Sequence, residues 1–337
     1  MQTTFRSHYC NDVTRALEGN TVKVAGWVST IRDHGGITFI DLRDQTGIVQ
    51  VVVEDDSKLV HVTRESVISV TGKVTYRGEG NENPKLATGE IEIVADSVDL
   101  LGPVTQPLPF EVDESKKIRE DVRTKYRYLD LRNPAVFNNI LLRSRINSWM
   151  RNKMESMGFV EIATPILTAD SPEGARAFLV PARQHPGKFY ALPQAPQMFK
   201  QLLMVGGFDR YFQIAPCFRD EDARADRAAG EFYQLDMEMS FATQEDMFEL
   251  GEIVYYELFK TFGKKEVSPA PFRRIPFRES MERYGTDKPD LRNPLEVVNV
   301  TEVFANTGFN AFKNSTVKAI AVHDLSLIHI SEPTRPY

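Results

Sequence analysis

Charged side chains are concentrated in FRDEDARADRAAGEF at residues 218–232, between two patterned apolar segments. RYFQIAPC precedes this stretch, and in YQLDMEMSF, which follows it, apolar and polar residues alternate strictly. Alternation with a period of two predicts a strand with one apolar face and one polar face. The two segments therefore predict an antiparallel hairpin whose turn carries Arg219 and Glu221. The polar face of its second strand carries Asp236 and Glu238.

This combination of residues is suited to binding a substrate with both positive and negative groups. Carboxylates on an inward strand face are costly unless they pair with cations or bind a ligand. The planar guanidinium of Arg219 matches phosphate and carboxylate groups. The acids could hold an ammonium group while the arginine holds a phosphate. A salt-bridged surface hairpin would give the same pattern, so the hairpin residues alone leave both interpretations open.

A second set of candidate residues lies before the hairpin. APQMFKQLLMVGG predicts a helix that begins at Pro196 and ends at two glycines, with Gln197 and Lys200 on one face. SPEGARAF predicts a glycine-bearing loop that contains Glu173, and FLVPARQHPGKFYALP predicts a hairpin that turns at residues 185–188. By spacing alone, Gln197 and Lys200 fit a solvated helix face better than a binding site.

The N-terminal part of the chain predicts an all-β module. Residues 20–103 contain five strand-like segments, with a helical candidate, SKLVHVTRE, between the third and the fourth. This is the arrangement of an OB barrel, whose open face commonly binds single-stranded nucleic acid. Stacking, hydrogen-bonding and cationic groups on that face would come from Arg32, His34, Phe39 and Gln50. Phe39 could equally belong to the core, and OB barrels have many uses.

The segments between the barrel and the hairpin predict further elements. Residues 104–133 form a linker with a short helix, and Asn133 then caps a helix in which Pro134 occupies the first turn. An apolar stripe on this helix must be covered by a core or by a second subunit. GFVEIATPILT predicts a strand interrupted by Pro165, and residues 243–263 predict a capped amphipathic helix.

Composition restricts the class of protein. The chain has 337 residues, 42% hydrophobic and 26% charged, which is ordinary for a soluble globular protein. No stretch approaches the roughly 18 apolar residues of a membrane span. Cys10 and Cys217 match no metal spacing and indicate free thiols in the cytoplasm. A net charge of −6 argues against a protein coated in nucleic acid, although a local basic groove remains compatible with it.

Several motifs resemble one enzyme family. Pro165, at the end of a strand after a long helix, resembles motif 1 of class II aminoacyl-tRNA synthetases, and the strand–loop–strand around Phe218-Arg219-Asp220-Glu221 resembles motif 2. YRYLDLRNP, SPEGARAFLVP and KFYALPQAPQMFKQLLM resemble the bacterial-type aspartyl-tRNA synthetases. GWVSTIRDHGGITFIDLRDQTGIVQVV resembles their anticodon-binding OB domain. The resemblance covers residues 1–325.

The resemblance implies a two-step ligase reaction. Aspartate would attack the α-phosphate of ATP to give aspartyl-adenylate and pyrophosphate, with Mg²⁺ neutralising phosphate oxygens. The aspartyl group would then pass to the 3′-terminal adenosine of tRNA-Asp. Arg219 would bridge the aspartate carboxylate and the α-phosphate, and Glu221 would contact the base or ribose region of ATP.

The resemblance also implies a subsite for aspartate. Lys200 would pair with the side-chain carboxylate of aspartate. A cation at this position suits an aspartate substrate, whereas a lysine-specific relative would need an acid there. Glu173, Gln197 and Asp236 would surround the ammonium group, with Glu173 on a mobile loop that closes over the substrate. In the barrel, Phe39 would stack on an anticodon base, helped by Arg32 and Gln50.

The implied architecture is multidomain α+β. We expect an OB-fold barrel followed by part of a class II antiparallel-sheet catalytic domain, divided into an anticodon-binding domain (1–105), a hinge (106–133), an incomplete catalytic domain (134–290), the start of an insertion domain (291–325) and a non-native tail (326–337). The parent protein is expected to form a homodimer through the helix after residue 134 and the Pro165 strand.

Two departures from the family pattern modify these expectations. Motif 3, with its ATP-binding arginine, and the acidic metal ligands do not occur in these residues, so the chain alone is expected to be inactive and to hold no metal. ADRAAGEF replaces the commoner ADRQPEF, which puts an ATP contact at Ala228 in doubt. His34, where tRNA-Asp-restricted members carry an apolar residue, suggests that tRNA-Asn is also charged. The rival hypothesis is a non-catalytic OB module that binds tRNA or single-stranded nucleic acid on a degenerate synthetase scaffold.

Overall fold

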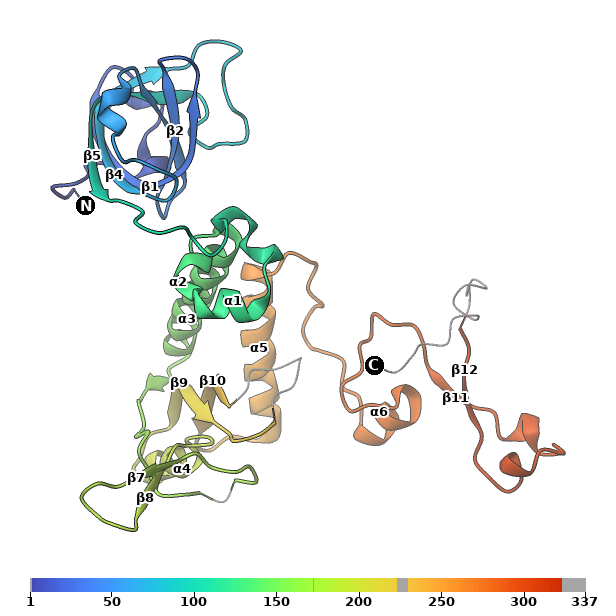
Figure 1. Ribbon diagram of the computed structural model, residues 1–337. Coiled ribbons are helices and arrows are strands. Elements are labelled where there is room, and N and C mark those ends of the chain that lie inside the picture. The colour runs from blue at the N-terminus through green and yellow to red at the C-terminus, as the bar shows by residue number, and fades with distance from the viewer. Residues whose placement is uncertain (1, 172, 223–229, 323–337) are drawn as a thin grey trace. The chain divides into compact units, whose positions relative to one another are not determined.

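The computed structural model describes the whole chain except residues 1, 172, 223–229 and 323–337 (Figure 1). The chain divides into two compact units, Met1–Phe137 and Asn138–Tyr337. Among the described residues, no helix combines the length and the apolar character that crossing a membrane requires.

The first unit is built on a closed five-stranded barrel. Its strands are β1 (Thr21–Asp33), β2 (Thr38–Arg43), β3 (Ile48–Val53), β4 (Val67–Tyr76) and β5 (Ile91–Gly102). They close in the order β1-β2-β3-β5-β4, and only the β3–β5 pairing is parallel. Inward-facing aliphatic side chains such as Val24, Ile40 and Val70 are fully buried in the barrel core. The predicted OB barrel is confirmed.

The predicted helix between β3 and β4 is wrong in extent. The segment contains a single 3₁₀ turn, Asp56–Leu59, in which the Asp55 side chain accepts a hydrogen bond from the backbone N–H of Ser57. The residues that follow, VHVTRE, are rich in β-branched types, which disfavour helix. His61 then adopts a left-handed backbone conformation with φ of 64°, which ends any helical run.

Short helical turns flank the barrel on both sides. Those before it are the 3₁₀ turns Cys10–Asp12 and Arg15–Leu17. After it come a 3₁₀ turn (Val112–Lys117), α1 (Glu120–Lys125) and α2 (Arg127–Asp130). The predicted linker with a short helix therefore contains three helical turns. Asp130 is fully buried and accepts hydrogen bonds from Arg123, which fixes α1 against α2.

The second unit is a mixed α/β structure. Its helices are α3 (Pro134–Ser156), whose first four residues belong to the first unit, α4 (Gln197–Val205), α5 (Gln244–Phe262) and α6 (Phe277–Tyr284). Its strands are β6 (Val160–Glu161), β7 (Leu179–Pro181), β8 (Phe189–Ala191), β9 (Arg210–Phe218), β10 (Glu231–Met239), β11 (Val297–Asn299) and β12 (Lys318–Ile320). Two 3₁₀ turns, Glu302–Phe304 and Asn310–Phe312, lie between β11 and β12. The main sheet has the order β10-β9-β6, and β7 with β8 forms the predicted hairpin.

One face of the main sheet is apolar and packs on two helices. Leu235, Met237 and Met239 of β10 contact a core that includes Met154 of α3 and Val254 of α5. Helices α3 and α5 run side by side (Figure 1), and the Lys153 ammonium is 2.7 Å from the Glu257 carboxylate between them. The apolar stripe of α3 is only partly covered within the chain, since Met154 is its one fully buried member.

The predicted strand at GFVEIATPILT is much shorter than expected. Only Val160 and Glu161 pair with β9, and the Ile162 N–H adds one hydrogen bond of 3.1 Å to Phe212. Pro165 has no N–H group to donate, so the sheet ladder cannot continue through it. The chain rejoins another strand at Thr168, which forms an isolated bridge with Ala191. By contrast, the predicted caps are present: Thr243 forms a capping box at the start of α5.

Candidate functional site

The face of the sheet opposite the apolar core is polar. Across the β9–β10 hairpin, Asp236 lies directly opposite Gln213 and Glu238 lies directly opposite Tyr211. Residues that face each other across an antiparallel pair project to the same side of the sheet. The two strands that the period-two pattern predicted, β9 and β10, therefore share one polar face that carries acids.

Lys200 of α4 is bound to this polar face. Its Nζ lies 2.9 Å from Oδ1 of Asp236 and 3.4 Å from Oε2 of Glu238. The side chains of Lys200 and Asp236 are only 12% and 9% exposed. Burial disfavours the charge of Lys200, but the hydrogen bond and the charges of the two carboxylates outweigh it and raise the lysine pKa above its ordinary value. Lys200 is therefore held as a cation.

The cluster of Lys200, Asp236 and Glu238 has unused capacity for a positive ligand. Asp236 Oδ2 is buried, and no donor among the described residues is directed at it, because the nearby Tyr211 hydroxyl donates to Gln213. One ammonium group faces two carboxylates, so the cluster is short of one positive charge. Buried carboxylate oxygens of this kind are costly when left alone and are satisfied by a donor. A ligand ammonium group fits this requirement.

Sequence reasoning missed two polar residues of β9, Tyr211 and Gln213, which lie opposite Glu238 and Asp236 in the hairpin. Tyr211 is fully buried, and its hydroxyl donates to Gln213 Oε1 at 2.9 Å. Thr164 donates to the same oxygen at 2.9 Å. Burial, reinforced by the nearby charge of Asp236, raises the pKa of Tyr211 so that its phenol stays neutral. The alternation of Tyr211 and Gln213 with Phe212 and Ile214 was the available signal.

Arg219 and Glu221 lie where the hairpin turns. Arg219 follows the last residue of β9, and its guanidinium carbon is 5.0 Å from the centre of the Phe232 ring. Its N–H donates to the Gly230 carbonyl at 2.8 Å. Glu221 is exposed. Arg219 therefore has a stacked, partly buried position at the end of the polar face. Ala228, where an ATP contact was in doubt, lies outside the described residues.

Cys217 is buried next to these residues, and its burial disfavours the reactive thiolate form. Burial raises its pKa to about 11, although the positive charge of Arg219 acts in the opposite direction. Its Sγ lies 3.3 Å from the Gln234 side-chain oxygen.

The Glu173 loop is fastened to the start of α4. Gln194 accepts a hydrogen bond from the Ala175 N–H at 3.1 Å and donates to the Ala175 carbonyl at 2.9 Å. Ser171 Oγ donates to Glu173 at 3.3 Å. A cavity of about 330 Å³ is lined by Glu173 and by residues at the start of α4, Met198 among them. Among the described residues, no hydrogen bond joins Glu173 or Gln197 to the Lys200 cluster.

The barrel carries a second polar site. Arg32 donates to both carboxylate oxygens of Asp41, at 2.7 and 2.9 Å, and lies 3.4 Å from Gln50 Oε1. Gln50 donates to Glu92 at 2.9 Å. Phe39 lies opposite Arg32 in the β1–β2 ladder. The hydrogen bonds that Arg32 donates to Asp41 raise the pKa of Arg32, so this guanidinium remains charged.

Phe39 belongs to this surface and not to the deep core. Its side chain is half-buried, and the His34 ring lies edge-on at 5.4 Å between centroids. The structure therefore brings all four predicted residues of the barrel face together. Sequence reasoning missed Asp41 and Glu92, which orient Arg32 and Gln50.

Comparisons with known proteins address the identity of the chain. Residues 119–329 match the family model for tRNA synthetases class II (D, K and N). The chain belongs to the class II tRNA synthetases of this group. Residues 22–101 match the OB-fold nucleic acid binding domain.

Individual relatives agree with this assignment. The chain of this class II synthetase is 55% identical over 324 residues to an aspartate–tRNA ligase of Streptomyces griseus, covering 95% of the chain and 54% of that protein. It is 53% identical over 332 residues to an aspartate–tRNA(Asp/Asn) ligase of Chlorobium phaeovibrioides, covering 97% of the chain and 55% of that protein. The chain thus spans about half the length of the curated relatives it matches.

A solved structure supports the fold of this synthetase chain. The asparaginyl-tRNA synthetase of Pyrococcus horikoshii, complexed with asparaginyl-adenylate, superimposes with a TM-score of 0.66 and 25% sequence identity. The match covers 75% of this chain and 57% of that one. The predicted fold class, an OB barrel followed by a class II catalytic fold, is confirmed. Its sheet has one parallel pairing, β6 with β9, among the described strands.

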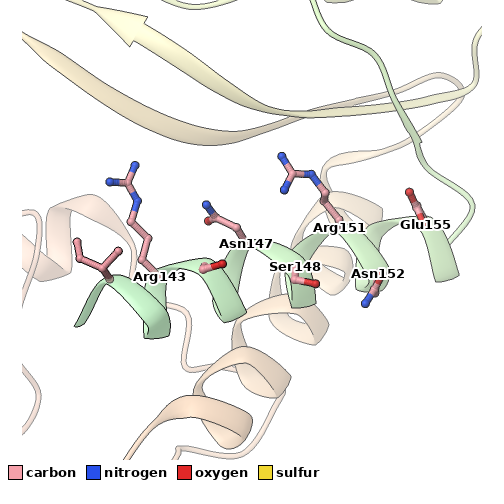
Figure 2. Close-up of a pocket in the computed structure, with 8 residues that line it drawn as sticks. Arg143, Asn147, Ser148, Arg151, Asn152 and Glu155 are labelled. Atoms are coloured by element: carbon pink, nitrogen blue, oxygen red, sulfur yellow. The ribbon is translucent and has the colours of Figure 1, made fainter. Parts of the chain in front are cut away.

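The second unit also has a polar groove along α3. Figure 2 shows Arg143, Asn147 and Arg151 on one face of the helix, with both guanidinium groups directed toward the strands above it in that view. Arg143 lies 5.0 Å from the Tyr233 ring, and Arg151 donates to Glu161 at 3.0 Å. The groove has a volume of about 460 Å³.

Proposed function

We propose that this chain carries the aspartate-binding and anticodon-binding parts of an aspartate–tRNA ligase. The observation that carries the proposal is the buried Lys200–Asp236 pair with the unpartnered Asp236 Oδ2. Such a cluster is suited to a small ligand that brings one ammonium group and one carboxylate. The family membership and the names of the relatives supply the wider context.

In this proposal, aspartate binds by replacing part of the contact between Lys200 and its two carboxylate neighbours with contacts to its own charged groups. The substrate ammonium group would satisfy Asp236, with Gln197 and Glu173 completing its surroundings. The substrate side-chain carboxylate would take a hydrogen bond from Lys200, which its two carboxylate neighbours already hold as a cation. Asparagine would offer a neutral amide in place of a carboxylate, and a buried cation favours the charged partner.

Adenylate formation would take place at the end of the polar face. An oxygen of the aspartate α-carboxylate would attack the α-phosphorus of ATP, forming one P–O bond while the bond to the pyrophosphate oxygen breaks. Arg219 would stabilise the charge that develops between carboxylate and phosphate, and Glu221 would contact the adenosine. In the second step, the terminal ribose hydroxyl of the tRNA would attack the acyl carbon, and AMP would leave.

ATP and Mg²⁺ are the cofactors of this proposal. Among the described residues, no three His, Cys, Asp or Glu side chains group as a metal site. Mg²⁺ bound with ATP would neutralise charge on the phosphate oxygens.

The tRNA would be read on the barrel. Phe39 would stack on an anticodon base, while Arg32 and Gln50, both oriented by carboxylates, would supply hydrogen bonds. tRNA-Asp is the proposed substrate. His34, edge-on to Phe39, is the basis for including tRNA-Asn, and relatives of both specificities match this chain at similar identity.

The parent protein would act as a homodimer in the cytoplasm. The partly exposed stripe and polar groove of α3, with Arg143 and Arg151, offer a surface for a second copy (Figure 2). Reducing conditions would keep the buried thiols of Cys10 and Cys217 free.

The aspartate site is tested by calorimetry with a non-hydrolysable aspartyl-adenylate analogue. The chain should bind it, Lys200→Met should abolish the binding, and Lys188→Met, on the exposed β7–β8 turn, should leave it unchanged. The closed barrel, whose surface carries Arg32, Phe39 and Gln50, supports a second candidate, a non-catalytic RNA-binding module. RNA binding without any binding of the analogue would favour that candidate.

A further inference from the structure

A buried carboxylate in the first unit holds two guanidinium groups. Glu65 receives hydrogen bonds from Arg43 Nη2 of β2 at 2.8 and 2.9 Å and from Arg132 Nη1 at 2.9 Å. Arg132 lies near the end of the predicted hinge, residues 106–133, and residues 111–133 of that hinge are named the hinge segment. The side chains of Glu65, Arg43 and Arg132 are 5%, 7% and 26% exposed. One carboxylate thus joins a barrel strand to the far end of the hinge segment.

The near end of the hinge segment is attached to the same region of the barrel. Arg64 Nη1 lies 2.7 Å from Glu111, and Arg43 Nη1 lies 3.9 Å from Asp113. Asn133 Nδ2 donates to the Asp113 carbonyl at 3.1 Å, so the two ends of the segment also bind each other. Two consecutive residues in the turn before β4, Arg64 and Glu65, therefore fasten both ends of the segment.

The turn that presents Glu65 is strained and held. Glu65 has a φ of 64°, a left-handed backbone conformation that is unfavourable for a non-glycine residue. Its N–H donates to Val28 at 2.7 Å, which keeps the turn in place. The Arg132 guanidinium carbon also lies 5.2 Å from the centre of the Trp27 ring. A strained conformation of a buried acid is retained only where surrounding contacts hold it. Here those contacts hold the Glu65 carboxylate in the position where it binds Arg132.

We propose that Arg132 is a positioning residue for tRNA binding: through Glu65 it fixes the hinge segment on the barrel. The inference rests on the proposed function, because it concerns how the chain binds tRNA. Two contacts with one RNA reinforce each other when the connection between them is stiff, and the gain falls when the connection becomes flexible. A fixed hinge segment would make the anticodon contacts and the contacts of later residues a single binding event.

The first test measures hydrogen exchange in the hinge segment of the full chain. Arg132→Ala leaves the Arg43–Glu65 pair intact, so the barrel keeps its fold. The matched control is Arg119→Ala, which lies in the same segment with a side chain 83% exposed and pairs with Asp121. Arg132→Ala should speed exchange of the hinge-segment amides about fivefold or more, and Arg119→Ala should not. Equal exchange in the two variants would overturn the proposal.

The second test compares two RNAs, an isolated anticodon stem-loop and full-length tRNA-Asp. Arg132→Ala should weaken the binding of full-length tRNA-Asp about tenfold, while the affinity for the stem-loop stays within about twofold of the wild-type value. Arg132→Lys should recover part of the loss, since it restores the charge without the planar fork. Equal weakening of both RNAs would mean that Arg132 merely stabilises the barrel, which contradicts a positioning role. A wild-type chain that binds neither RNA would refute the proposed function, and hydrogen exchange would still decide whether Arg132 holds the segment.

Discussion

Replacing Lys200 by methionine probes the cluster on which the proposed function depends. The substitution keeps most of the side-chain volume and leaves Asp236 and Glu238 without their shared cation. Removing one partner of a fully buried pair costs about 3–5 kcal/mol. Because the Glu238 side chain is 30% exposed and can regain water, we expect Lys200→Met to cost about 2–4 kcal/mol of unfolding free energy. Asp236→Asn should cost about 1–2 kcal/mol, since Lys200 keeps Glu238.

The assay is urea unfolding followed by tryptophan fluorescence. The chain has two tryptophans, Trp27 in β1 and Trp149 in α3, so a Trp27→Phe background makes the signal report the second unit alone. The double variant of Lys200→Met and Asp236→Asn should lose less than the sum of the single losses, by about 1–3 kcal/mol. Additive losses, or a Lys200→Met cost below about 0.5 kcal/mol, would refute the pair as a stabilising contact.

The pH dependence of that difference has a defined sign. The pKa of Lys200 is raised in the folded state, so its stabilising contribution is complete below the unfolded lysine pKa of about 10.4 and is lost as pH rises through the folded value. The stability gap between wild type and Lys200→Met should therefore be constant from pH 6 to 9, a range well below about 10.4, and should shrink at higher pH. A gap that closes near neutral pH would contradict the raised pKa.

Three further predictions concern other parts of the chain. Phe39→Ala should weaken anticodon stem-loop binding by about 1–3 kcal/mol, and Phe5→Ala, at an exposed phenylalanine outside the strands, should not; fluorescence anisotropy measures both, and equal effects would argue against stacking on Phe39. Thr243→Ala removes the capping box of α5 and should lower the unfolding free energy by about 1 kcal/mol, whereas an unchanged urea midpoint would count against the cap. Cys217, with a pKa raised to about 11 by burial, should react with Ellman's reagent at pH 8 only after unfolding in urea, and rapid labelling of the folded chain would disprove its burial.

Local patterns in the sequence predicted the elements that carry the site. Period-two alternation located the β9–β10 hairpin and the polar face with Asp236, and proline, glycine and threonine signals located the ends of α4 and α5. These signals work because side-chain direction and capping depend on residues within one or two turns. The same local reasoning overextended the helix after β3, where β-branched residues and a left-handed His61 limit the segment to one turn.

Contacts between distant residues could not be predicted in this way. Glu65 binds Arg43 and Arg132, which lie 22 and 67 positions away, and no local pattern indicates that these three charges meet. Gln213 accepts a hydrogen bond from the hydroxyl of Thr164, 49 positions away, and no local pattern indicates this contact either. The charged residues were visible in the sequence, but their partners depend on tertiary packing. Lys200 was assigned to the aspartate site by resemblance, and the structure supplies its physical setting against two acids.

The most direct test of the central claim is the affinity of the purified chain for tRNA-Asp, tRNA-Asn and an unrelated tRNA at one fixed salt concentration. Fixed salt is necessary because phosphate contacts alone give salt-dependent, unspecific affinity. The proposed function predicts that tRNA-Asp, with tRNA-Asn if His34 relaxes the specificity, binds more tightly than the unrelated tRNA, and that Phe39→Ala removes the difference. Equal affinity for all three tRNAs by a folded chain would contradict the assignment of the barrel face to anticodon recognition.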